Sequence, residues 1–164
     1  MIEKIHAMKN KKGFTLVELI VVLVILAILA ALLIPALTGY IDKANKEKVV
    51  SETRMVAMAV QTEASEAYGQ LKSGESLSDW STPVDSGKVD HIANIVKLAE
   101  VLDGTKTKFT AEVNLDGSIN TVIYTDGTYT CTYDANAKTY NTLKVAEAKN
   151  TPTENKVTFK KSDT

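Results

Sequence analysis

A long and almost entirely apolar stretch near the N-terminus, residues 14–37, constrains this chain more than any other feature. Its 24 residues include only two polar ones, Thr15 and Glu18, and several lysines precede it. A helix rises about 1.5 Å per residue and a bilayer core is about 30 Å thick, so the stretch is long enough to cross a membrane. The lysines predict that the short N-terminus lies in the cytoplasm and that the residues after 37 lie outside.

Glu18 is the one charged residue inside this stretch. A carboxylate deep in a membrane costs about 2.5–3.5 kcal/mol, and less near the interface. One interpretation is that Glu18 reaches the headgroups or stays protonated. The other is that it meets a cation in an assembled state, and the nearest candidate is a new amino terminus at Phe14, created by cleavage after Gly13.

The basic leader, the sequence GFTLVE at residues 13–18 and the long aliphatic helix with Pro35 together resemble type IV pilins and their pseudopilin relatives. The resemblance covers about the first 40 residues. It implies that a prepilin peptidase cuts between Gly13 and Phe14 and that Phe14 is then N-methylated. It also implies that Glu18 pairs with the Phe14 amine of a neighbouring subunit and sets the register of a helical filament. A cytoplasmic assembly ATPase and a membrane platform protein are the further partners that it implies.

Residues 1–13 are accordingly expected to be a cleaved leader, with four lysines and one glutamate. A secretory signal peptide would have a shorter apolar region, with its cleavage site after that region. A plain signal anchor explains the length and orientation, but neither Gly13 before Phe14 nor Glu18. The chain that follows the leader is mildly acidic, which disfavours wholesale binding to nucleic-acid phosphates.

The apolar helix, residues 14–37, is expected to continue as an amphipathic helix over residues 38–73, because apolar residues keep a helical spacing without a convincing loop. The stripe that should pack on a sheet contains Ala59, Val60, Ala64, Ala67, Tyr68 and Leu71. Pro35 and Gly39 predict a break or kink between the two halves. The resemblance implies that this joint can melt and lengthen in a filament, whereas a kink without a function is the alternative.

Residues 74–106 are expected to form a surface connection with a short helix at residues 90–102, ended by Gly104. Trp80 is interpreted as an anchor of this loop against the domain. His91 has no companions at metal-ligand spacing, so we expect an ordinary surface histidine.

Residues 107–164 switch to a period of two, which predicts strands at residues 108–114, 118–125, 128–133 and 139–145. Asp-Gly pairs at 116–117 and 126–127 are typical of hairpin turns. A last run, residues 156–161, is expected as an edge strand whose lysines suit exposure. The predicted fold class is α+β: a long, kinked N-terminal helix packed on an antiparallel meander of about four strands, as in the pilin fold.

No catalytic or metal-binding pattern is found in the sequence, so neither an enzymatic activity nor a cofactor is expected. Glu63 and Glu66 lie close on one helix, and a solvated helix face accounts for them. Cys131, the single cysteine, is expected to be a small buried residue, with an intermolecular disulfide as the alternative. With one cysteine the chain cannot form an internal disulfide, and in this respect it resembles pilins of Gram-positive bacteria.

The function expected from these features is that of a structural subunit. It would sit in the cytoplasmic membrane as a precursor and then polymerise through its apolar helix into a surface filament that serves adhesion or motility. A pseudopilin of a type II secretion or DNA-uptake system is the alternative with the same architecture. A membrane-anchored binding module that never polymerises is the alternative of a different class.

Overall fold

The structure of the chain is a computed structural model that describes residues 13–81 and 89–160. The chain divides into two compact units, Met1–Asp42 and Lys43–Thr164. The predicted leader lies outside the described residues except for Gly13, as does Lys161 of the last predicted strand.

In the first unit, the helix α1 (Leu16–Gly69) begins, and every described side chain up to residue 41 is exposed. Leucine, isoleucine, valine and alanine dominate here, and the leucines and alanines among them are good helix formers. Helical residues continue through Pro35 and Gly39, and the Thr38 hydroxyl donates a hydrogen bond to the Pro35 carbonyl at 2.9 Å. The opening of this joint in a filament stays a prediction.

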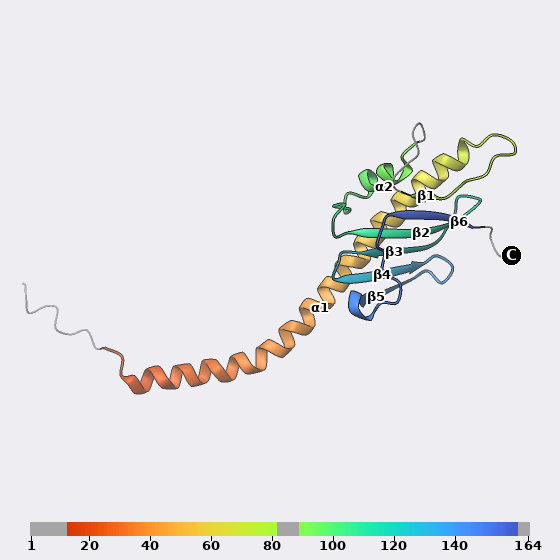
Figure 1. Cartoon of the computed structure of the whole chain (residues 1–164). Helices are drawn as coiled ribbons and strands as arrows, with labels where there is room; N and C mark the ends of the chain where they lie inside the picture. Colours follow the sequence, from red (N-terminus) through yellow and green to blue (C-terminus); the bar gives the residue numbers. More distant parts are fainter. Residues whose placement is uncertain (1–12, 82–88, 161–164) are drawn as a thin grey trace, which may run out of the picture. The chain divides into compact units, whose positions relative to one another are not determined.

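The second unit contains the sheet, with strands β1 (Trp80–Ser81), β2 (Lys108–Asn114), β3 (Ile119–Thr125), β4 (Tyr129–Asp134), β5 (Thr139–Lys144) and β6 (Lys156–Lys160). Strands β2 to β5 form the predicted antiparallel meander. The order across the sheet is β1-β6-β2-β3-β4-β5. The long helix and this mostly antiparallel sheet make an α+β architecture consistent with the pilin fold, as expected (Figure 1).

The edge position expected for the last strand is wrong. After β5 the chain passes through the short 3₁₀ helix η2 (Val145–Glu147) and returns to pair in parallel with β2, while β1 pairs with the other side of β6. Periodicity alone could not show this, because a strand pattern does not specify its neighbours.

The hairpin turns follow their predicted chemistry. Gly117 and Gly127 have φ of 81° and 87°, which is left-handed backbone that favours glycine. The Asp116 carboxylate accepts a hydrogen bond from the Ser118 amide, and the Asp126 carboxylate accepts from the amides of Thr128 and Tyr129. These turns fix the register of the meander.

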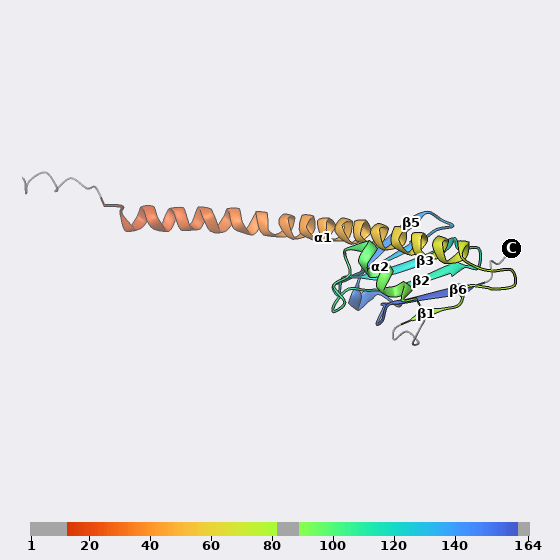
Figure 2. The same cartoon turned by 90° about the horizontal axis from the view of Figure 1, so that it is seen from above.

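The core lies between one face of the sheet and the helices, α1 from Val49 onward and α2 (His91–Ala99) (Figures 1 and 2). From α1 it takes Val49, Val56, Ala57, Ala59, Val60 and Ala64, so the buried stripe begins earlier than predicted. It also ends earlier, because Tyr68, which was expected in the stripe, lies beside the end of α1 and is 48% exposed. Trp80 and Cys131 are both buried in this cluster, as expected.

The short helix α2 ends earlier than predicted. Asp90 caps its start by accepting a hydrogen bond from the Ala93 amide at 2.8 Å. Its last helical residue is Ala99, and Glu100 adopts left-handed backbone with φ of 56° at the C-cap. The predicted stop at Gly104 is therefore wrong by several residues, because Glu100 takes the left-handed conformation that glycine usually supplies.

Candidate functional site

The start of α1 carries a capping box formed by Thr15 and Glu18. The Thr15 amide and hydroxyl both donate to Glu18 Oε2 at 2.8 Å, and the Glu18 amide donates to Thr15 Oγ1 at 3.3 Å. This reciprocal arrangement satisfies amide groups that have no partner inside the helix. The sequence analysis missed it, although the pattern Thr-x-x-Glu before an apolar run is its usual signal.

The capping box positions the residues of the predicted cleavage site. Because α1 begins at Leu16, Gly13 and Phe14 lie outside the helix, and the Phe14 side chain is 81% exposed. The bond between them is thus in non-helical, exposed chain. Gly13, Phe14 and Glu18 lie together at this helix start, whereas Pro35 and Gly39 lie several turns further along α1.

The cost of placing the Glu18 charge in apolar surroundings is partly offset within its own chain, because its carboxylate accepts hydrogen bonds from Thr15. Both hydrogen bonds that the carboxylate accepts from Thr15 use Oε2, and within the described residues Oε1 has no hydrogen-bond partner. Within the part of the chain that the structure describes, one oxygen therefore caps the helix and the other is left for a cation.

The apolar part of α1 presents a continuous exposed surface. Within the described ranges, α1 is the one helix that is long and apolar enough to cross a membrane, by length and composition. Its leucines, isoleucines and valines between residues 16 and 37 are each at least half exposed. Such a surface needs lipid or other protein around it.

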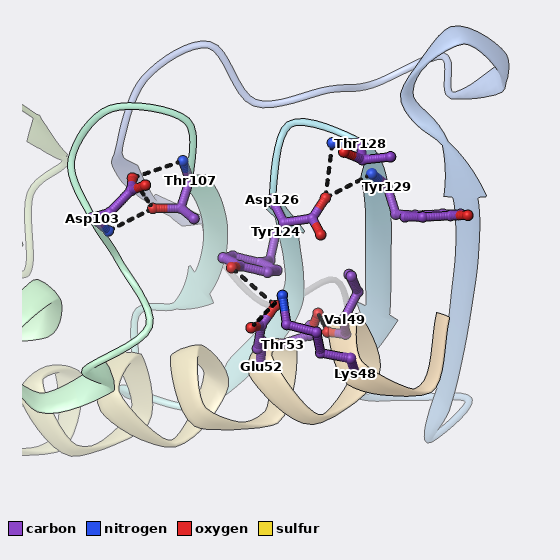
Figure 3. Close-up of polar contacts among 10 residues, drawn as sticks. All are labelled: Lys48, Val49, Glu52, Thr53, Asp103, Thr107, Tyr124, Asp126, Thr128 and Tyr129. Atoms are coloured by element: carbon purple, nitrogen blue, oxygen red, sulfur yellow. Dashed lines mark hydrogen bonds and ion pairs between the residues drawn. The ribbon is translucent and has the colours of Figure 1, made fainter. Parts of the chain in front are cut away.

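In the second unit, α1 is tied to the sheet by polar contacts. The buried Tyr124 hydroxyl donates to Glu52 Oε2 at 3.2 Å, and Lys48 Nζ lies 3.2 Å from Glu52 Oε1 (Figure 3). Burial, and then the negative charge of Glu52, raise the pKa of the Tyr124 hydroxyl well above its ordinary value. The hydroxyl therefore stays protonated and serves as a donor between strand and helix.

A second polar contact joins α1 to α2 and corrects two expectations. Glu63 has a side chain only 6% exposed, and its Oε1 accepts hydrogen bonds from His91 Nδ1 at 2.7 Å and Asn94 Nδ2 at 2.9 Å. The His91 ring stacks on Trp80 with centroids 4.2 Å apart. The expectations of a solvated Glu63 and an ordinary surface His91 are wrong, because α2 folds back over this face of α1.

Gln61 of α1 holds the turn between β2 and β3. Its Nε2 donates to the Gly117 carbonyl at 2.8 Å, and its Oε1 accepts from the Ile119 amide at 3.2 Å. One side chain thus satisfies two backbone groups of the hairpin. The contact fixes the turn at a defined height along α1.

The loop before β2 is organised by Asp103. Its Oδ1 accepts from the amides of Thr105, Lys106 and Thr107 and from the Thr107 hydroxyl at 2.7 Å. Figure 3 shows the contacts with Thr107. These bonds, that of the Thr107 side chain foremost, hold the pKa of the Asp103 carboxyl well below its usual range. Among the described residues, no group of three or more His, Cys, Asp or Glu side chains is placed to hold a metal ion.

Comparison with known protein families gives one match. Residues 8–34 match the family model of the prokaryotic N-terminal methylation motif, so the chain carries a prepilin signal of the type IV pilin kind. The match spans the leader end, the helix start and most of the apolar stretch. Comparisons with curated proteins and with solved structures give no match.

The motif and the fold together mark a prepilin-like protein of the pilin or pseudopilin type. The motif belongs to a class of structural proteins and implies processing by a prepilin peptidase. With the long apolar helix, it also indicates anchoring in a membrane before assembly.

Proposed function

We propose that this protein is the structural subunit of a type IV pilus filament, into which it polymerises through the apolar part of α1. The observation that carries the proposal is the exposed apolar helix that begins within the prepilin signal. In the membrane precursor, lipid covers this surface, with the N-terminus inside and the residues after 37 outside. In the filament, helices of neighbouring subunits replace the lipid, and close packing supplies the dispersion contacts.

Cleavage between Gly13 and Phe14 creates a positively charged amine, methylated in the mature subunit. This amine pairs with Glu18 of a neighbouring subunit, at the carboxylate oxygen that the capping box leaves available. Each of the two charges is costly alone in an apolar bundle. The pair therefore adds little net stability but penalises every register in which the charges do not meet.

The first test is the intact mass and N-terminal residue of protein from material sheared off its native cells. We expect a chain that begins at Phe14 and carries one added methyl group. A sheared fraction without this chain, with the processed protein retained in the membrane, would favour a pseudopilin instead. A chain that retains its leader would contradict the proposal and favour a plain anchored module.

The second test separates the charge of Glu18 from its capping role. Glu18→Ala removes both, whereas Glu18→Gln keeps an oxygen that accepts from the Thr15 amide but removes the charge. We expect both variants to be inserted and cleaved, and both to lose filaments when sheared yield is measured. Wild-type yield from Glu18→Gln would show that capping suffices and would refute the charge pair.

A further inference from the structure

The outer face of the sheet, which is turned away from α1, carries a row of side chains that cross it from strand to strand. The strand register places Lys156 of β6, Thr110 of β2, Ile123 of β3, Thr132 of β4 and Asn141 of β5 side by side. Their neighbours Val157, Ala111, Val122 and Cys131 are buried on the helix-facing side. The five strands span about 19 Å, at about 4.8 Å per gap.

Two hollows lie on this face and adjoin. The larger, about 430 Å³, lies over β6, β2, β3 and β4, and the smaller, about 230 Å³, lies between β4, β5 and the segment after η2. Thr132 and Asn150 line both hollows. We call the combined feature the outer-face trough.

The segment after β5 builds one wall of the trough. It turns back beside the β4–β5 side of the sheet (Figure 1) and covers Thr130, which is 3% exposed and lies 3.3 Å from Thr151 between the hydroxyl oxygens. Asn150, which lines both hollows, belongs to this segment. The trough is thus shaped by two separate parts of the chain, the sheet and the returning segment.

Several hydrogen-bonding groups in the trough are unused. The hydroxyls of Thr110, Thr121 and Thr132 and the amide of Asn150 make no side-chain hydrogen bond to any other described residue. The three threonines are half-buried. Each hydroxyl and each amide can donate and accept, so the trough offers both kinds of group to a ligand.

The charges along the trough balance. Glu112 and Glu147 are matched by Lys149 and Lys156, and Glu112 is also paired with Lys160. An anionic ligand such as a nucleic acid would need a surplus of positive charge. A protein partner would be expected to find aromatic or arginine anchors, and neither hollow has one in its lining.

We propose that the outer-face trough binds a neutral oligosaccharide of about four pyranose rings. The hydroxyls of such a sugar both donate and accept hydrogen bonds, as the side chains of the threonines and of Asn150 do. The apolar faces of the sugar rings can lie on Ile123 and Leu143. The trough remains accessible in an assembled filament if α1 faces the filament core, and only this accessibility rests on the proposed function.

The test uses the full chain, purified in a zwitterionic detergent that has no sugar headgroup. Saturation-transfer NMR is recorded with cellotetraose and with tetraacetylchitotetraose, and tetragalacturonate serves as the anionic comparison. We expect binding of at least one neutral probe and a preference over tetragalacturonate. Thr132→Val keeps the shape and the strand preference of the side chain but removes its hydroxyl, and it should weaken binding about tenfold.

Thr139→Val is the matched control, because Thr139 lies on β5, the strand next to that of Thr132, but lines neither hollow. It should bind as the wild type does. No signal from either neutral probe at about 10 mM, a stronger signal from tetragalacturonate, or equal loss in both variants would each overturn the proposal. Because binding is measured on dispersed subunits, its failure is distinguishable from a failure to form filaments.

Discussion

Replacing His91 tests how strongly the polar contact between α1 and α2 holds the second unit together. In His91→Phe the ring that stacks on Trp80 is kept, but the donor to Glu63 Oε1 at 2.7 Å is lost. A hydrogen bond to a charged group contributes about 1.5–3 kcal/mol, and Glu63 is too buried for water to replace the donor freely. We therefore expect the free energy of unfolding to fall by about 1.5–3 kcal/mol.

His91→Ala removes the stack as well. An aromatic pair adds about 0.5–1.5 kcal/mol, so the total loss should reach about 2–4.5 kcal/mol. The assay is urea unfolding of the detergent-solubilised chain, followed by the fluorescence of Trp80, the single tryptophan of the chain. Lys97→Ala, at an exposed position of the same helix, is the control and should change the free energy by less than about 0.5 kcal/mol.

The reasoning would be refuted by a His91→Phe variant as stable as the Lys97→Ala control. That result would mean that Asn94 alone, whose Nδ2 lies 2.9 Å from the same oxygen, satisfies the buried carboxylate. A large loss in His91→Ala with none in His91→Phe would assign the effect to the stack on Trp80.

Three further changes probe the second unit. Tyr124→Phe should lower the free energy of unfolding by about 1–2 kcal/mol in the same urea assay, because it removes the hydroxyl that donates to Glu52. Asp103→Asn should flatten the loss of stability in acid. Folding lowers the pKa of Asp103, so this carboxylate stabilises the fold above its ordinary pKa, and the stabilisation is lost as the pH falls. The measurement is thermal unfolding between pH 6 and pH 3, a range set by the ordinary pKa of about 3.9. Gln61→Leu should speed hydrogen exchange at the turn around Gly117, because it removes the side chain that holds two backbone groups there.

Much of the fold could be predicted from local pattern. The strands β2 to β5 lie within a residue or two of their predicted bounds, because alternation and Asp-Gly turns are signals confined to a few neighbouring residues. The burial of Cys131 was predicted from its place within a strand pattern, and that of Trp80 from its interpretation as the anchor of a surface loop. The Thr15–Glu18 capping box is equally local, and its Thr-x-x-Glu pattern predicts it from the sequence.

The features that were not predicted from the sequence share a different cause. The position of β6, the burial of Glu63 and the contact of His91 each depend on a partner far along the chain. Glu63 and His91 are 28 residues apart, and neither has a local pattern that names the other. A charged residue on a predicted helix is exposed in most cases, so only the docking of α2 could reveal the exception.

The sequence by itself determined the stretch that is long and apolar enough to cross a membrane, the prepilin signal and the meander, because length, composition and period act within short segments. The tertiary structure decided the insertion of β6 between β1 and β2, the polar contacts that fix α1 on the sheet, and the trough on the outer face. These features arise where distant segments meet, and their energies depend on burial and on partners that no local pattern specifies.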